Sequence, residues 1–215
     1  MKKKNILIFL GGEWHKFNEF DKFINQILGD LYNIESTYDF NKLQELESKK
    51  IDVAIFYTCI DKEFNEIKEN KYKITDAQIT SLINWVKSGG SLLTFHSTTV
   101  LGNLDERLKK IIGGNFISHP EPYPVTIYPL FKKHSIINGI SAFTVFDEFY
   151  IQDIQDDIEI LMVSIDRSLA YPMVWIREDE NGKIVNISMG HDEKVWSDNS
   201  YQRLILQSLS WLTEI

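Results

Sequence analysis

Short apolar runs alternate with helical patterns along the first half of the chain. We predict strands at residues 6–10, 34–40, 52–57 and 91–95, and helices between them at 17–31, 75–88 and 103–112. Wholly apolar runs such as ILIFL are typical of strands buried on both faces of a sheet. The alternation of strand and helix therefore predicts a parallel sheet with right-handed crossovers and helices on both faces.

Two of these helices have start and stop signals. Thr75, with a glutamine three residues later, matches a capping box, and Gly89 follows the last apolar position. Asn103, with a glutamate three residues later, is the predicted cap of the next helix, which ends at Gly113. Both helices have clear predicted boundaries.

The second half has a different pattern. Strand-like runs follow one another without helices at 125–130, 143–149, 158–163 and 173–176. They predict antiparallel strands at one edge of the sheet or a β-rich insertion. A last buried strand at 184–189 precedes an amphipathic helix at 201–212, and the charged segment 59–73 is predicted to be a surface excursion or lid.

The organisation of the chain predicts a single domain over residues 1–215, because no Pro, Gly or Ser linker and no repeat interrupts it. Hydrophobic residues at 43% and charged residues at 25% are typical of a globular protein. The fold class predicted is α/β, with a three-layer, doubly wound, mostly parallel sheet and antiparallel edge strands.

Charge and cysteine content exclude several classes of function. The net charge of −8 disfavours partners with phosphate backbones and anionic membrane surfaces, and the first apolar run is too short to span a membrane. The single cysteine, Cys59, forms no internal disulfide and fits a reducing compartment, so we expect a cytoplasmic protein. Glycine spacings match neither a phosphate loop nor a dinucleotide fingerprint, so no nucleotide cofactor is expected.

Histidines mark the predicted carboxyl ends of the strands, where ligands bind in open α/β sheets. His15, His96 and His191 each follow a predicted strand, and His119 lies in a loop near the change of pattern. Histidine serves as a proton shuttle and as a metal ligand near neutral pH. A divalent metal such as zinc is a candidate cofactor, with His15, His96 and His119 as its candidate ligands.

Other residues have alternative structural interpretations. His134 is expected to be structural, and Asp147 and Glu148 are expected to point to opposite faces of a strand, so that one of them is solvated. Cys59 is interpreted as structural. A hydrolase with Ser97 as nucleophile is a further alternative, although the glycine-flanked elbow of such enzymes is missing.

Seven motifs in order resemble one known family. They read LGGEWH, SGGSLLTFHST, GGNFISHP, HSIING, DEFY, PMVW and MGHDEKVW, and they span almost the whole chain. This pattern resembles the ThuA-like (trehalose utilisation) family of the class I glutamine-amidotransferase-like superfamily. The chain departs from the family pattern at Thr94 and Phe95, where Gly and Leu are expected, and at Ser135, where Pro is expected.

The resemblance implies a flavodoxin-like or amidotransferase-like fold and a role in the utilisation of trehalose or a related sugar. It places His96, His119, Glu148 and His191 as catalytic candidates around one pocket. The candidates for substrate binding are Gly12, Trp14, His15, Ser97 and Trp196, the tryptophans by stacking on a sugar ring. His96 stands where glutaminase relatives place their cysteine, so no cysteine glutaminase activity is expected.

The leading hypothesis is an enzyme whose His and Glu side chains perform acid/base or metal-assisted chemistry on a small sugar derivative. The alternative is a catalytically inert module that binds a sugar or a partner. The sequence is compatible with a homo-oligomer, and it does not identify the sugar or the reaction.

Overall fold

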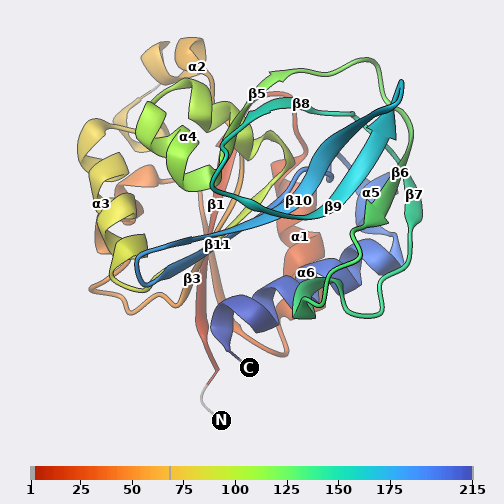
Figure 1. The fold of residues 1–215 in the computed structure, drawn as a ribbon. Helices are drawn as coiled ribbons and strands as arrows, with labels where there is room; N and C mark the ends of the chain where they lie inside the picture. The colour runs from red at the N-terminus through yellow and green to blue at the C-terminus, as the bar shows by residue number, and fades with distance from the viewer. Residues whose placement is uncertain (1–2, 68, 215) are drawn as a thin grey trace.

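The computed structural model describes residues 3–67 and 69–214 (Figure 1). The strands are β1 (Asn5–Gly12), β2 (Asn33–Thr37), β3 (Val53–Cys59), β4 (Ser91–Phe95), β5 (Gly114–Ser118), β6 (Tyr123–Pro129), β7 (Phe143–Asp147), β8 (Ile151–Ile154), β9 (Glu159–Asp166), β10 (Leu169–Asp179) and β11 (Gly182–Ile187). The α-helices are α1 (Phe17–Leu28), α2 (Lys62–Ile67), α3 (Asp76–Lys87), α4 (Glu106–Ile112), α5 (Glu193–Trp196) and α6 (Asn199–Thr213). The 3-10 helices cover Phe40–Glu45, Asn70–Tyr72, His96–Asn103 and Ser135–Ile137.

Within the described residues, one nine-stranded sheet has the order β2-β1-β3-β4-β11-β10-β9-β6-β7. The first five strands in this order are parallel, and the remaining four are antiparallel to their neighbours. The predicted fold class, including antiparallel strands at one edge, is confirmed. The second strand, β2, lies on the opposite side of β1 from β3, so the strand order reverses there, where α/β sheets form binding crevices.

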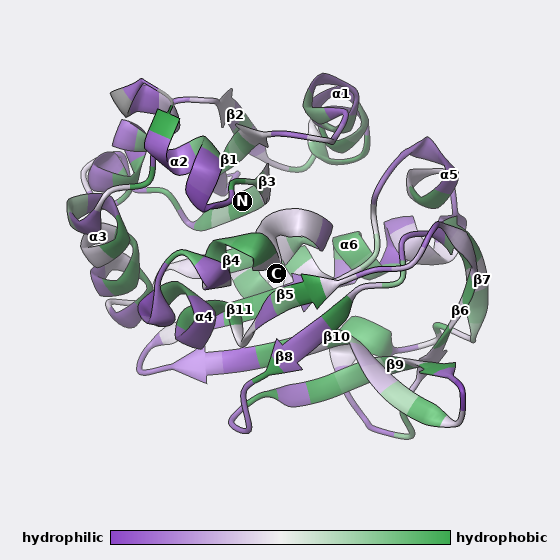
Figure 2. Cartoon of the chain, turned by 90° about the horizontal axis from the view of Figure 1, so that it is seen from above, coloured by the Kyte–Doolittle hydropathy of each residue, from purple (hydrophilic) through white to green (hydrophobic). Residues whose placement is uncertain are grey.

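Two hydrophobic cores lie on opposite faces of the sheet. Alternate residues of β1 point to different cores, with Ile8 facing the α1 and α6 side and Leu7 and Phe9 facing the α3 and α4 side. Figure 2, seen from above, shows α3 and α4 on one side of β4 and β11 and α5 and α6 on the other. This is the predicted three-layer arrangement.

Several predicted boundaries are wrong for local reasons. The strand predicted over 34–40 ends at Thr37, because the Asp39 side chain accepts the Asn41 N–H and starts a 3-10 turn. Asn103 is not the cap of α4, since Asp105 accepts the Arg107 N–H in that role. The capping box at the start of α3 and the left-handed glycine at the end of α4 are confirmed.

Some elements had no clear sequence signal. β5 and β8 form a separate two-stranded antiparallel sheet, and α2 lies inside the segment predicted to be a surface excursion. The loop after β11 contains the short helix α5. Among the described residues, no helix combines the length and apolar character needed to cross a membrane.

Gly12 ends β1 where the backbone approaches β3 very closely. Its φ is +117°, and a Cβ atom there would lie 1.9 Å from the Cys59 carbonyl oxygen. The next residue, Glu13, donates its N–H to the same oxygen at 3.0 Å. Gly12 therefore sets the path of the β1–α1 loop.

We expect Gly12→Ala to lower the free energy of unfolding by about 3 kcal/mol or more, because steric overlap adds to the cost of a positive φ. Gly89→Ala is the matched control, since Gly89 has a φ of +116° but its Cβ would meet nothing closer than 3.9 Å. Urea unfolding of both variants measures the difference. Equal losses would contradict the clash as the cause.

Candidate active site

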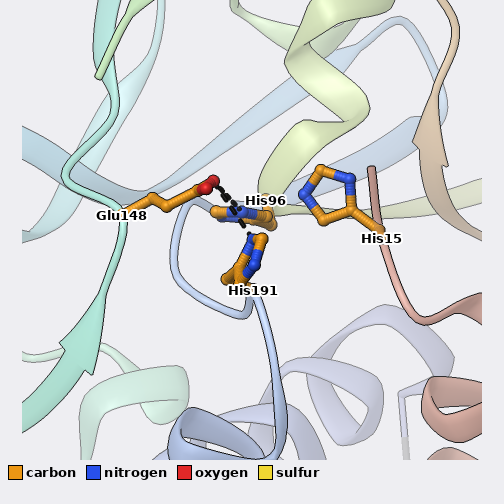
Figure 3. A group of neighbouring side chains, drawn as sticks. All are labelled: His15, His96, Glu148 and His191. Atoms are coloured by element: carbon orange, nitrogen blue, oxygen red, sulfur yellow. Dashed lines mark hydrogen bonds and ion pairs between the residues drawn. The ribbon is translucent and has the colours of Figure 1, made fainter. Parts of the chain in front are cut away.

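Four side chains from distant parts of the chain converge at the carboxyl ends of the parallel strands. His15 follows β1, His96 follows β4, Glu148 follows β7 and His191 lies beyond β11 (Figure 3). One nitrogen from each histidine and one carboxylate oxygen all lie within 4.8 Å of one another. We call these four residues the His/Glu cluster.

His96 is fully buried and has an unusual backbone conformation. Its φ is +45°, which is uncommon for a residue other than glycine and often marks a functional site. Its Nδ1 lies 2.9 Å from the Ser188 carbonyl oxygen, which can only accept a hydrogen bond. Nδ1 therefore carries a hydrogen, and Nε2 lies 3.2 Å from Glu148 Oε2, within reach of a shared proton or a shared cation.

The His15 ring is also held by a hydrogen bond from Nδ1 to a backbone carbonyl oxygen. Its Nδ1 donates to the Glu13 carbonyl oxygen at 3.1 Å, so the lone pair of the neutral ring is on Nε2. Nε2 is buried and has no hydrogen-bond partner among the described residues. Burial, reinforced by the nearby His96, lowers the pKa of His15 to about 3, so the ring is neutral at physiological pH.

Glu148 is the acidic member of the cluster. Its Oε2 lies 3.2 Å from His96 Nε2, 3.2 Å from His191 Nδ1 and 3.8 Å from His119 Nε2. Burial alone would raise the pKa of Glu148, but the contacts with His191 and His96 outweigh burial and hold this pKa well below its usual range. The contact with Glu148 in turn raises the pKa of His191. Glu148 is thus an ionised carboxylate.

The donor set of the cluster fits a divalent transition metal. Imidazole nitrogen and carboxylate oxygen are the ligands that such ions prefer, and ligating histidines usually donate their other N–H to a carbonyl or carboxylate. His15 and His96 both make this second hydrogen bond to a backbone carbonyl. A contact of 3.2 Å between His96 Nε2 and the Glu148 carboxylate is favourable when a proton or a cation lies between the two atoms.

His119 lies beside the cluster but outside the group of four. Its Nε2 is 3.8 Å from Glu148 Oε2, and its ring stacks on Tyr150 with centroids 5.4 Å apart. The structure therefore gathers His15, His96, Glu148 and His191 as possible ligands, whereas the sequence had suggested His119 in place of the last two. The Tyr150 ring also contacts the His96 ring, with centroids 4.2 Å apart. Tyr150 was not identified as a candidate from the sequence, although it belongs to the DEFY motif.

Asp147 is buried and is not solvated, which corrects the expectation that one of the two adjacent acids faces water. Its carboxylate accepts the backbone N–H groups of Glu148 at 2.9 Å, Gly190 at 2.8 Å and His191 at 3.1 Å. β7 ends at Asp147, so the alternation of side chains along a strand does not extend to Glu148. Asp147 positions two members of the His/Glu cluster through their backbones.

Trp196 is buried and cannot stack on a sugar as the sequence suggested. Its indole Nε1 donates to the Gly190 carbonyl oxygen at 2.8 Å, and its ring packs against Phe20 with centroids 5.5 Å apart. The Tyr57 hydroxyl donates to the His191 carbonyl oxygen at 2.9 Å. These contacts fix the loop that carries His191.

Three further candidates take structural positions. Ser97 is fully buried, and its Oγ has no hydrogen-bond partner among the described residues, so the structure offers no base for a serine nucleophile and no contact with substrate. His134 caps the 3-10 helix at Ser135–Ile137 by accepting the Ile136 N–H, as expected for a structural histidine. Burial raises the pKa of the Cys59 thiol to about 12, so the thiol is protonated.

A cavity of about 460 Å³ adjoins the cluster and has the size of a small-molecule site. It is lined by Trp14, His15, Cys59, Asp61, Val100, Asn103, Phe116, Ile117, His119, Glu148 and Tyr150. A larger hollow of about 560 Å³ lies beside the start of β4 and has no histidine in its lining. The smaller cavity is therefore the candidate active site.

Solved structures share this fold. A ThuA-like protein from Parabacteroides merdae is 14% identical, with a TM-score of 0.79 over 99% of this chain and 90% of that chain. A ThuA-like protein from Bacteroides uniformis is 18% identical, with a TM-score of 0.77 over 97% and 91%. A cytoplasmic protein from Salmonella typhimurium LT2 is 12% identical, with a TM-score of 0.67 over 97% of each chain.

No curated protein matches the sequence significantly. The family model for ThuA, described as trehalose utilisation, matches residues 5–212. This match covers nearly the whole chain and confirms the resemblance inferred from the seven motifs. The protein therefore belongs to the ThuA (trehalose utilisation) family.

Proposed function

We propose that this protein is an enzyme of carbohydrate utilisation in which the His/Glu cluster holds a divalent transition metal such as zinc and acts on a sugar derivative. The observation that carries the proposal is the convergence of His15 Nε2 and His96 Nε2 on the ionised Glu148, with the Nδ1 atom of each ring held by a backbone carbonyl oxygen. Such an ion supplies Lewis acidity toward a carbonyl or hydroxyl oxygen when bound. The family description supports the assignment to sugars.

The side chains around the cavity support acid/base chemistry. His119 is partly exposed, at 33% of its side chain, and its Nε2 faces the cavity side of Glu148. It is the group best placed to exchange a proton with a bound substrate and with water. The Tyr150 ring packs against both the His96 ring and the His119 ring, with centroid distances of 4.2 Å and 5.4 Å.

The charges of the cavity favour an uncharged sugar. Its charged lining residues, within the described part of the chain, are Asp61 and Glu148, and neither lysine nor arginine lines it. Phosphate and carboxylate groups are normally recognised by arginine or lysine. A sugar without such groups is therefore the preferred substrate.

Glutamine hydrolysis is not part of the proposal. The elbow after β4 carries His96, and burial keeps the thiol of Cys59, the single cysteine of the sequence, protonated. The likeness to a cytoplasmic protein of Salmonella and the free cysteine support a location in the cytoplasm.

Elemental analysis of purified protein tests the metal. We expect about one divalent transition ion per chain in the wild type, its loss in His15→Ala and its retention in His119→Ala, because His119 lies outside the group of four. His119→Ala is the matched control, since it also removes an imidazole that faces the cavity.

The absence of metal from every sample after reconstitution would contradict the metal site. Catalysis without metal or the inert sugar-binding module would then explain the cluster. Loss of the ion in both variants would instead place His119 among the ligands.

A further inference from the structure

The cavity has two chemically different ends. Toward the cluster, its lining residues are nearly buried, with Tyr150 at 3% exposure and the Glu148 side chain at 12%. On the solvent side, Trp14 is 82% exposed and Ile117 is 57% exposed. Large apolar side chains that are exposed at the mouth of a ligand cavity favour binding of an apolar surface of the ligand.

Trp14 is held outward by a strained backbone. Its φ is +71°, and a left-handed conformation costs a bulky residue roughly 1–2 kcal/mol. The strain accompanies a tight turn in which His15 Nδ1 donates back to the Glu13 carbonyl oxygen, with Trp14 between them. The same turn therefore directs the His15 ring into the cluster and the indole toward solvent.

The Trp14 indole is largely exposed and lines the cavity. Among the described residues, the rings in contact with His15 are those of Phe17, Tyr57, His96 and His191, and Trp14 is not one of them. Ile117 reaches the same cavity from β5, an element distant in sequence. The two side chains together form what we call the apolar clamp.

We propose that the apolar clamp is a second subsite, which binds an uncharged second sugar ring while the first ring occupies the His/Glu cluster. The C–H face of a pyranose stacks on indole, and its hydroxyl groups point sideways. Asp61, which also lines the cavity, provides a carboxylate acceptor for such hydroxyls. This inference rests on the proposed function and restricts its substrates to disaccharides and related glycosides.

Calorimetric titration with trehalose and glucose, on metal-loaded protein, tests the subsite. We expect Trp14→Ala to weaken trehalose binding about 10-fold, which corresponds to about 1.4 kcal/mol, and to change glucose binding less than about 2-fold. Trp14→Phe, which retains an aromatic face, should recover most of the trehalose affinity. Phe131→Ala is the control, because Phe131 is a fully exposed aromatic residue outside the cavity lining.

Equal trehalose affinity in wild type and Trp14→Ala would overturn the subsite and leave the proposed function intact. Equal weakening of both sugars would also overturn it, because Trp14 would then support the first ring through His15. A wild-type protein that holds its metal but binds neither sugar would overturn the subsite together with the sugar assignment. Urea unfolding of each variant confirms that differences in binding do not arise from unfolding.

Discussion

Glu148→Gln is expected to weaken the affinity for a divalent metal by more than about 100-fold, beyond the usual effect of losing a group that only orients a ligand. The substitution keeps the shape of the side chain but removes the charge that faces His96 and His191 at 3.2 Å each. The amide of glutamine is a poor ligand compared with a carboxylate. Activity toward the sugar substrate should fall with metal occupancy.

Competition with a chromophoric chelator measures this affinity. Glu193→Gln is the matched control, because Glu193 lies two residues beyond His191 and pairs with Lys16 on the surface. It should bind metal as the wild type does. If Glu148→Gln also retains full affinity, Glu148 is not a ligand and its role is to balance the charge of the histidines.

The parallel half of the fold could be predicted because its signals are local. Apolar runs of strand length and a capping box at Thr75 are read within a few residues of the chain. The positions of His15, His96 and His191 at strand ends then follow from the rule for ligand sites in such sheets. The sequence therefore predicted the edge of the sheet at which the cluster lies.

The remaining parts of the site depend on contacts that are distant in sequence. β5 and β8 are short strands, and within the described residues they pair only with each other. Their apolar pattern is too weak to predict them from the sequence. Trp196 was expected to stack on a sugar ring because it lies beside a candidate loop, but its ring packs against Phe20 on α1. Nothing within a few residues of Trp196 indicates that contact.

The sequence suggested His119 as a metal ligand, whereas the structure groups Glu148 and His191 with His15 and His96. This difference also arises from contacts between residues that are distant in sequence. A sequence shows that a histidine is near a strand end, but the direction of its ring depends on its hydrogen-bond partner. For His96 this partner is a carbonyl oxygen 92 residues away, at Ser188. Three-dimensional structure was needed to find such second partners, which decide whether a ring can act as a ligand.

Asp147→Ala is expected to destabilise the protein by at least about 3 kcal/mol, because it leaves three backbone N–H groups in a buried site without their acceptor. For a chain of this length, that loss corresponds to a fall in melting temperature of roughly 6–12 °C. Burial raises the pKa of Asp147, but His96 and the same three N–H groups oppose that rise. The side chain acts as the acceptor for these three N–H groups.

Asp147→Asn should have an intermediate effect, since its remaining carbonyl oxygen replaces Oδ1, which accepts from Glu148 and His191, while its amide faces the Gly190 N–H. The surface control is Asp153→Asn, which removes an exposed ion pair with Lys109 and should cost less than about 1 kcal/mol. Thermal unfolding of metal-free protein ranks the three variants. A loss for Asp147→Asn no larger than that of the control would contradict the need for two acceptor oxygens at this position.

Asp147→Asn also tests whether Asp147 positions the metal ligands in addition to stabilising the fold. Asp147 holds the backbones of Glu148 and His191 together, so its loss displaces two of the four cluster members at once. We therefore expect folded Asp147→Asn to bind metal at least about 10-fold more weakly, as for other groups that orient ligands. Unchanged metal affinity in the folded variant would limit Asp147 to stabilising the loop, because a cluster held by its side chains alone would not need this carboxylate.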